Sequence, residues 1–173
     1  MWDFFETVRH RHSIRRYQSG RAVERERLHA ILETACAAPS AGDLQAYHIV
    51  VVEEQTTRDA LSQAAHQQSF IAEAPVCLAF CADPARSAEQ YGERGANLYA
   101  LQDATIAAAY AQLAVVAAGM GSTWIGYFDE AAICRILELR DGLTPVALLS
   151  VGYPFELPEE TSRRRLDDMV SWM

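Results

Sequence analysis

Arg11-His12-Ser13-Ile14-Arg15-Arg16-Tyr17 is the stretch of this chain that points most directly to its fold and site. Alternate side chains of an extended backbone lie on one face, so Arg11, Ser13 and Arg15 would converge on one point. Two guanidinium groups and a hydroxyl suit a phosphate dianion, because Arg binds phosphate through paired, charge-assisted hydrogen bonds. Arg16 alternates out of phase with Arg11, and we expect it to be solvated or in a salt bridge.

A second informative segment is Pro39-Ser40-Ala41-Gly42-Asp43-Leu44-Gln45. Pro39 ends a helix that recurring apolar residues predict from about Val23 to Ala37. The small residues that follow allow a flat ligand to approach the backbone closely. A simple helix-ending turn with Gly42 at positive φ is the alternative interpretation, and the two are compatible.

The composition is that of one acidic globular domain. The chain has 173 residues, a net charge of −8, and 15 basic residues that are all Arg. An acidic balance argues against nucleic acid as a partner, since binding it rests on many phosphate contacts. Arg11, Arg15 and Arg16, and the run Arg163 to Arg165, are local exceptions that indicate local anions. Solvated basic faces or pairs with nearby carboxylates are the alternative.

No membrane or secretory signal is visible in the sequence. No apolar run is long enough to span a bilayer, and the N-terminus lacks a positive region followed by an apolar one. The four cysteines lie in apolar segments without a C-x-x-C motif, and the five histidines form no metal-ligand cluster. We therefore expect reduced, buried thiols, no metal site and a cytoplasmic protein that does not bind membranes.

Hydrophobic periodicity predicts a chain of alternating helices and strands. The predicted helices cover residues 3–9, 23–37, 56 or 57 to 66, 101–118 and 129–139. Thr56 or Thr57 is the expected cap of the third helix, and Asp129 that of the last. The predicted buried strands cover residues 47–52, 76–82 and 144–151. This alternation indicates an α/β or α+β fold with three layers. The pattern leaves open whether the strands are parallel or antiparallel.

The predicted helix 101–118 is apolar almost all round, so it must be buried on every side. In a chain of this size, such burial suggests help from a second subunit. The C-terminal Met169-Val170-Ser171-Trp172 is also apolar, with nothing local to pack on. Both features predict a homodimer.

The two opening segments, in this order, resemble the FMN-dependent nitroreductase superfamily, whose members carry R-x-S-x-R near the N-terminus and P-S-x-x-N-x-Q after the second helix. The resemblance runs from about Val8 to Val170. It implies an α+β, three-layer fold with a central, mostly antiparallel sheet flanked by helices. It also implies a single domain over residues 1–173, in which 153–173 form a C-terminal arm that embraces the partner of a dimer.

The resemblance also implies an FMN site, with Arg11, Ser13 and Arg15 on the phosphate and ribityl chain. His12 would add backbone or ring contacts, or is a surface histidine. The Pro39–Gln45 loop would reach the flavin of the partner subunit, with Asp43 where relatives have Asn. A carboxylate only accepts hydrogen bonds unless protonated, so it would disfavour negative charge on the ring.

Three further segments complete this site by resemblance. Gly119 to Gly126 would lie along the flavin ring, or is only a Gly-rich connection. Gln68 stands near the position where relatives place a cation by the pyrimidine edge of the flavin. The Arg163–Arg165 run would close over the phosphate, and the sequence leaves open which of these arginines contacts it. The implied FMN-binding residues are Arg11, His12, Ser13, Arg15, Pro39, Ser40, Ala41, Gly42, Asp43, Gln45, Gln68, Ile125, Gly126, Arg163 and Arg165.

The function implied by the resemblance is an FMN-dependent oxidoreductase that passes hydride from NAD(P)H through the flavin to a small acceptor such as a nitroaromatic or a quinone. We expect no catalytic side chain, because the flavin carries the chemistry. Two alternatives remain. One is a flavin-consuming, dehalogenase or dehydrogenase enzyme on the same fold, with the polar stretch 85–98 as a lid and Tyr91, Arg94 and Tyr99 as contacts. The other is a non-catalytic flavin-binding protein. Other nucleotide, zinc and hydrolase motifs are absent from the sequence.

Overall fold

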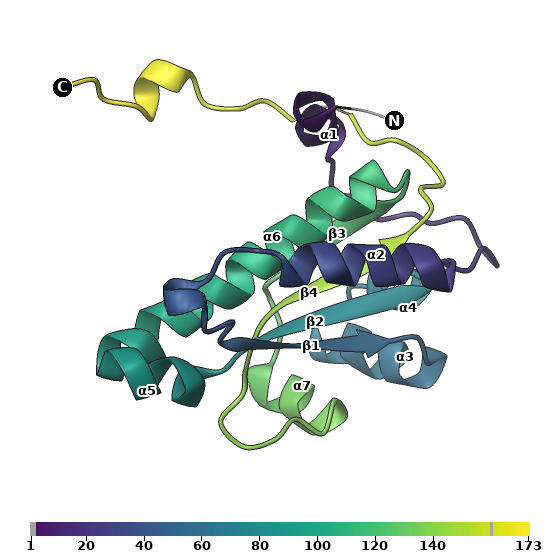
Figure 1. Ribbon diagram of the computed structural model, residues 1–173. Coiled ribbons are helices and arrows are strands. Elements are labelled where there is room, and N and C mark those ends of the chain that lie inside the picture. Colours follow the sequence, from purple (N-terminus) through teal and green to yellow (C-terminus); the bar gives the residue numbers. More distant parts are fainter. Residues whose placement is uncertain (1–2, 160) are drawn as a thin grey trace.

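The computed structural model describes residues 3–159 and 161–173, and its centre is a four-stranded sheet in the order β1-β2-β4-β3 (Figure 1). The strands are β1 (Tyr47–Val52), β2 (Val76–Ala82), β3 (Gly121–Ile125) and β4 (Thr144–Gly152). Every neighbouring pair is antiparallel. The α+β class and the antiparallel sheet implied by the resemblance are therefore confirmed.

Helices cover both faces of this sheet and make the fold three layers deep (Figure 1). Helices α2 (Arg25–Cys36) and α6 (Ala100–Ala117) cover one face, against Leu78 and Phe80 of β2. Helices α3 (Gln55–Ala64), α4 (Phe70–Glu73) and α7 (Glu130–Ile136) cover the other, against Cys77 and Ala79. All seven residues of β2 are buried, as expected of a central strand that presents alternate side chains to two apolar layers.

Most of the predicted elements are present, with local corrections. Helix α1 (Phe4–His10) begins at an Asp3 capping box, and Asp129 caps α7 through the N–H of Ala132. The expected Thr56 or Thr57 cap on α3 is wrong, because Glu54 is the N-cap and the Thr57 hydroxyl donates to its carboxylate. The prediction of a buried strand at 47–52 is also wrong in part, since β1 is an edge strand and of its residues only Val52 is buried.

Several elements were not expected from the sequence, among them the short helix α4. The polar stretch 85–98 is helical: α5 (Pro84–Arg94) has an Asp83 cap and Pro84 in its first turn, and it continues through a π-helical turn, η2 (Gly95–Tyr99), into α6. The Gly-rich connection contains strand β3. Short 3-10 turns, η1 (Ala41–Asp43) and η3 (Leu166–Asp168), complete the elements.

The four cysteine thiols differ in burial, whereas the sequence predicted that all of them are buried. Cys77 and Cys81 are buried, and burial raises the pKa of each thiol to about 12. Cys36 is exposed and Cys134 is half-buried, so the prediction of buried thiols is wrong for these two. Among the described residues, no group of His, Cys, Asp and Glu has the arrangement of a metal site.

Helix α6 is buried on one side only within a single chain. Ala104, Ala107 and Ala111 are fully buried, whereas Leu101 is 45% exposed and Tyr110 is also exposed. The continuous helical segment Pro84–Ala117 is long and apolar enough to cross a membrane, contrary to the sequence expectation. Half of its most apolar window is buried against the rest of the chain, and core helices of soluble proteins pass the same test.

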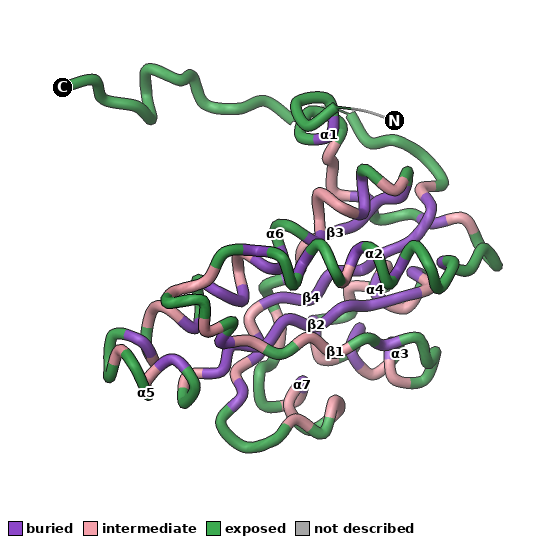
Figure 2. The backbone as a smooth tube through the Cα atoms, in the orientation of Figure 1, coloured by how far each residue is buried: buried purple, intermediate pink, exposed green. Residues whose placement is uncertain are grey.

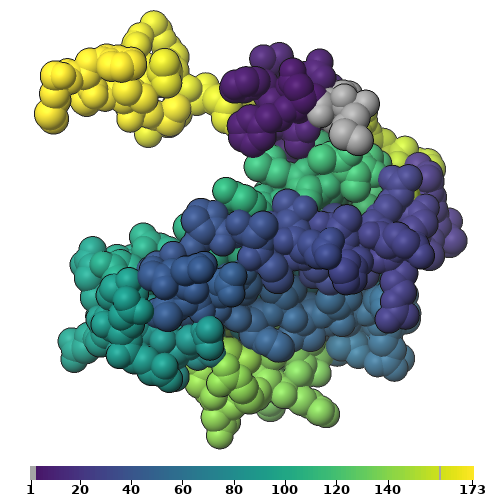
Figure 3. Space-filling view, in the orientation of Figure 1, coloured from purple at the N-terminus to yellow at the C-terminus, as the bar shows by residue number. Residues whose placement is uncertain are grey.

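The C-terminal segment leaves the rest of the chain after β4. Pro154 pairs with Tyr17, the N–H of Phe155 donates to the Arg16 carbonyl at 2.9 Å, and Glu156 pairs with Arg16. Beyond these contacts the chain runs out as an exposed, projecting arm (Figures 1, 2 and 3). Its apolar residues Leu157, Leu166 and Met169 are exposed, and Trp172 is 86% exposed. Such side chains gain nothing from folding until another surface covers them.

Candidate functional site

The N-terminal arginine segment is an extended strip beside β3. Ser13 forms a parallel bridge with Ser122, and the N–H of Ile14 donates to the Ser122 carbonyl at 3.0 Å. The Ile14 side chain is buried while Arg15 is exposed. A Cβ at Gly121 would overlap Ile14, so a glycine is needed where the strip crosses. Ile14 and Arg15 therefore lie on opposite sides of the strip, as neighbouring side chains of an extended backbone do.

The two arginines on this strip are available to an anion. Across residues 3–159 and 161–173, none of the ion pairs includes Arg11 or Arg15. The Arg15 guanidinium lies 5.7 Å from the ring centre of Phe70. Arg16 behaves as predicted, since it pairs with Glu156 at 3.0 Å.

His12 points with Ile14 to the other side of the strip. Both residues line a small cavity of about 110 Å³ together with Met120 and Pro154. On this side of the strip, the His12 ring is separated from the face that carries Arg11 and Ser13. His12 would therefore meet a ligand on that face through its backbone.

The loop Pro39–Gln45 is tightly turned and presents its residues outward. Gly42, Asp43 and Gln45 have φ values of 58°, 56° and 49°, so the expected positive φ at Gly42 is confirmed. Ser40 Oγ accepts the N–H of Gln45 at 2.9 Å. The side chains of Pro39, Asp43 and Gln45 are exposed, and those of Ser40 and Ala41 are half-buried.

Helix α5 packs directly against this loop. A Cβ at Gly42 would lie 2.5 Å from the hydroxyl of Tyr91, so a larger residue there would require the Tyr91 side chain to move. Tyr91 packs edge-on against Tyr99 at 5.1 Å, and Arg94 Nε donates to the Tyr99 hydroxyl at 2.9 Å. The three residues proposed as lid contacts therefore form one cluster beside the loop.

The end of β3 offers backbone rather than side chains. Ile125 is buried among the residues between the sheet and α7, while Gly126 is exposed. Gln68 lies close by and donates its amide N–H groups to the carbonyls of Ala65 at 2.8 Å and Tyr127 at 3.1 Å. The amide oxygen of Gln68 is what remains for a ligand, so it would accept rather than donate.

The C-terminal arginines are not brought to this site within one chain. Arg163 Nη1 donates to Thr161 Oγ1 at 2.6 Å, Arg164 to the Asp168 carbonyl at 2.7 Å, and Arg165 lies 3.8 Å from Asp167. All of these contacts are inside the projecting arm (Figure 3). A single chain therefore assembles Arg11 to Arg15 with β3, but leaves the Arg163–Arg165 run outside.

One buried residue that sequence reasoning missed is Asp103, on α6. Its carboxylate accepts the N–H groups of Ala41 and Ala46, at the two ends of the loop. An acidic residue in an otherwise almost apolar helix was the available signal.

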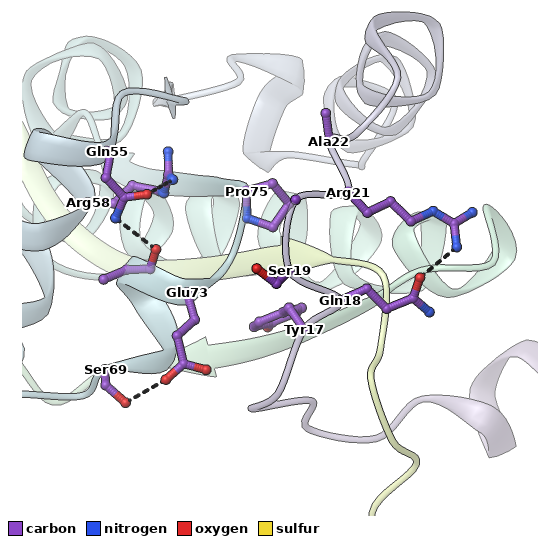
Figure 4. Close-up of a pocket in the computed structure, with 12 residues that line it drawn as sticks. Tyr17, Gln18, Ser19, Arg21, Ala22, Gln55, Arg58, Ser69, Glu73 and Pro75 are labelled. Carbon is purple, nitrogen blue, oxygen red and sulfur yellow. Dashed lines mark hydrogen bonds between the residues drawn. The ribbon is translucent and has the colours of Figure 1, made fainter.

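A second, larger cavity lies elsewhere, and none of the predicted site residues lines it. It has a volume of about 690 Å³ and lies between the 17–22 segment, α3 and α4 (Figure 4). The buried Arg58 in its wall donates to the Glu53 carbonyl and to Gln55 Oε1 at 2.6 Å. Glu73, which lines the same cavity, accepts from Ser69 Oγ at 3.0 Å. Each charged side chain named here already has a partner on the protein, although the buried Nε of Arg58 has none among the described residues.

The structure is thus an α+β fold with an antiparallel sheet, whose edge strand β3 is flanked by the strip that carries Arg11 and Arg15. The chain belongs to the Nitroreductase family, which it matches over residues 8–72 and 60–153. It is 32% identical to the NADH dehydrogenase of Thermus thermophilus over 94% of this chain and 92% of that protein.

Solved structures agree with this assignment. A nitroreductase family protein from Streptococcus pneumoniae superimposes with a TM-score of 0.89 at 25% identity, covering 99% of this chain and 100% of that one. The NADPH:FMN oxidoreductase of Vibrio harveyi in complex with NAD+ superimposes with a TM-score of 0.88 at 26% identity, covering 97% and 76% of the two chains.

Proposed function

We propose that this protein is an FMN-dependent oxidoreductase that passes hydride from NAD(P)H to a small acceptor such as a nitroaromatic or a quinone. The observation that supports the proposal is the strip beside β3, which carries Arg11, Ser13 and Arg15 and in which neither arginine has an acidic partner among the described residues. The names of its relatives, an NADH dehydrogenase and an NADPH:FMN oxidoreductase, support the same reaction.

The residues present fit FMN. Two guanidinium groups and the Ser13 hydroxyl match the donor needs of a phosphate dianion. The exposed Gly126 has no side chain to keep a flat ring from the backbone at the end of β3. Ile125, the amide oxygen of Gln68, and the His12 backbone complete the part of the site that one chain supplies.

Bound FMN supplies the hydride chemistry, and the protein supplies binding and orientation. Arg11 and Arg15 would hold the phosphate through paired hydrogen bonds, which fixes one end of the cofactor. The backbone at Gly126 would orient the other end.

We also propose a homodimer in which each chain is one domain over residues 1–173 and residues 153–173 embrace the partner. In the dimer the Pro39–Gln45 loop would reach the partner's cofactor, and Arg163 and Arg165 would close over a phosphate. The exposed side of α6 and the apolar arm support this arrangement. We place the protein in the cytoplasm, acting on small molecules rather than on nucleic acid or membranes.

The visible spectrum of the purified protein, recorded anaerobically with NADH and with NADPH, tests the function. We expect flavin absorbance that either donor bleaches and that returns when an acceptor is added. Flavin that neither donor reduces would indicate a non-catalytic flavin-binding protein. A colourless protein that does not take up added FMN would overturn the proposal.

A further inference from the structure

Asp103 is a buried carboxylate that holds both ends of the loop between α2 and β1. It lies in the first turn of α6 and is 2% exposed. Its Oδ1 accepts the N–H of Ala41 at 3.0 Å, and its Oδ2 accepts the N–H of Ala46 at 3.2 Å. Within residues 3–159 and 161–173, no ion pair includes Asp103. Backbone N–H groups of the loop therefore supply the hydrogen bonds that a buried carboxylate requires.

The loop between these two anchors needs such restraint. Asp43 and Gln45 have φ values of 56° and 49°, a region that costs free energy for residues other than glycine and persists only when surrounding contacts enforce it. Ser40 Oγ holds the N–H of Gln45 inside the loop. Asp103 ties both ends of this turn to α6, at positions 62 and 57 residues away in the sequence. Arg86 of α5 adds a contact in the middle of the loop, where its guanidinium donates to the Leu44 carbonyl.

We propose that Asp103 is the positioning residue that sets the Ser40–Gln45 loop in its cofactor-binding shape. This inference rests on the proposed function, in which the loop contacts FMN of the partner subunit. Asp103 does not touch the cofactor; it acts through the Ala41 and Ala46 amides. A carboxylate is required because both of its oxygens accept, whereas the amide of Asn would turn an N–H group toward one of the two donors.

A purely structural role for Asp103 makes a different prediction. If the carboxylate only stabilised the fold, its loss would lower the free energy of unfolding without changing the cofactor's environment. If it positions the loop, its loss would weaken FMN binding and change the visible circular dichroism of the bound flavin while the sheet stays intact. Asp103→Asn separates these roles because it keeps the side chain's size.

The test compares Asp103→Asn with wild type and with Asp129→Asn in the full-length protein. Asp129 also accepts a backbone N–H, at the start of α7, and Asn caps helices as well as Asp does. We expect Asp103→Asn to bind FMN about 10-fold to 100-fold more weakly, the ratio expected for losing a hydrogen bond to a charged group. In the apo proteins, hydrogen exchange should accelerate in residues 40–46 of Asp103→Asn and stay unchanged in β2 and β4. Asp129→Asn should match wild type in FMN affinity and in the exchange of 40–46.

Ala41→Pro provides a second variant that leaves Asp103 in place. It removes one N–H donor at the first residue of a 3-10 turn, where proline is tolerated, and Ser40 before it already has the extended backbone that a following proline requires. The variant that carries both changes should bind FMN no more weakly than Asp103→Asn alone, because both changes weaken the same link between the Asp103 side chain and the loop. If Asp103→Asn fails to fold, Ala41→Pro alone must show the weaker binding.

Wild-type affinity and an unchanged flavin spectrum in both variants would overturn the positioning role alone. A wild-type protein that binds no FMN would overturn the proposed function and this role together.

Discussion

Ser13 and Ser122 lie side by side in a parallel bridge, which fixes the arginine strip to the edge strand of the sheet. The hydrogen bond from Ile14 to the Ser122 carbonyl and the burial of Ile14 set which side chains face outward. The backbone of the strip is therefore held in place, so the positions from which the Arg11 and Arg15 side chains extend are fixed.

Arg15→Ala should weaken FMN binding by about 2 kcal/mol, or about 30-fold, because the phosphate loses a charge-assisted hydrogen-bond partner. Fluorescence titration of the apo protein measures this. Arg16→Ala is the matched control, since Arg16 pairs with Glu156 instead, and it should bind FMN as wild type does. Equal affinities in the two variants would remove Arg15 from the site.

Asp43→Asn should raise the flavin's reduction potential by tens of millivolts, where ~30 mV is about 1.4 kcal/mol for a two-electron couple. The reason is that a fixed carboxylate near the ring opposes the negative charge gained on reduction. Spectroelectrochemical titration of both proteins at one pH measures the shift. An unmoved potential would mean that Asp43 faces solvent.

Leu101→Asp should convert the dimer to monomers and release FMN. Leu101 is exposed in one chain on the apolar side of α6, so the substitution harms an interface rather than a core. Sedimentation velocity at low micromolar concentration measures assembly. Gln63→Asp is the control. Gln63 is an exposed residue of α3, on the face of the sheet opposite α6, so this variant should stay dimeric. A wild-type monomer that retains its FMN would contradict the dimer.

Tyr17→Phe should lower the free energy of unfolding by about 1–3 kcal/mol, the cost of leaving a buried polar group unpaired. The Tyr17 hydroxyl donates to the Ile14 carbonyl at 2.7 Å and lies 2.8 Å from Ser150 Oγ. Urea unfolding measures the change. Tyr127→Phe is the control, because the side chain of Tyr127 is largely exposed. A loss of the same size in both variants would show that the Tyr17 hydroxyl is not important.

The sheet's central strands could be predicted from sequence because their signals are local. Strand β2 is a continuous apolar run with a proline before it, and its boundaries match the predicted ones. Strand β3 could not be predicted in this way. Gly121 is required there because a side chain would overlap Ile14, and Ile14 is far away in the sequence. Helix α5 did carry local signals, an Asp83 cap followed by Pro84, but its polar composition hid them.

The candidate site also has a part that local sequence predicts and a part that depends on contacts between distant segments. The alternation of Arg11, Ser13 and Arg15 needs only an extended backbone, which the sequence indicates. Asp103 and the loop it holds meet only in the folded chain. The direction of the Arg163–Arg165 run depends on what covers the apolar arm, which neither the sequence pattern nor a single chain supplies.

Calorimetric titration of the apo protein with FMN and with riboflavin tests the central claim most directly, because the two ligands differ only in the phosphate. The account predicts one FMN per chain and riboflavin binding that is weaker by at least the ~30-fold expected for one charge-assisted contact. It also predicts that Arg15→Ala reduces the difference in affinity between FMN and riboflavin. Equal affinities for FMN and riboflavin in the wild-type protein would contradict the assignment of the arginine strip to the phosphate.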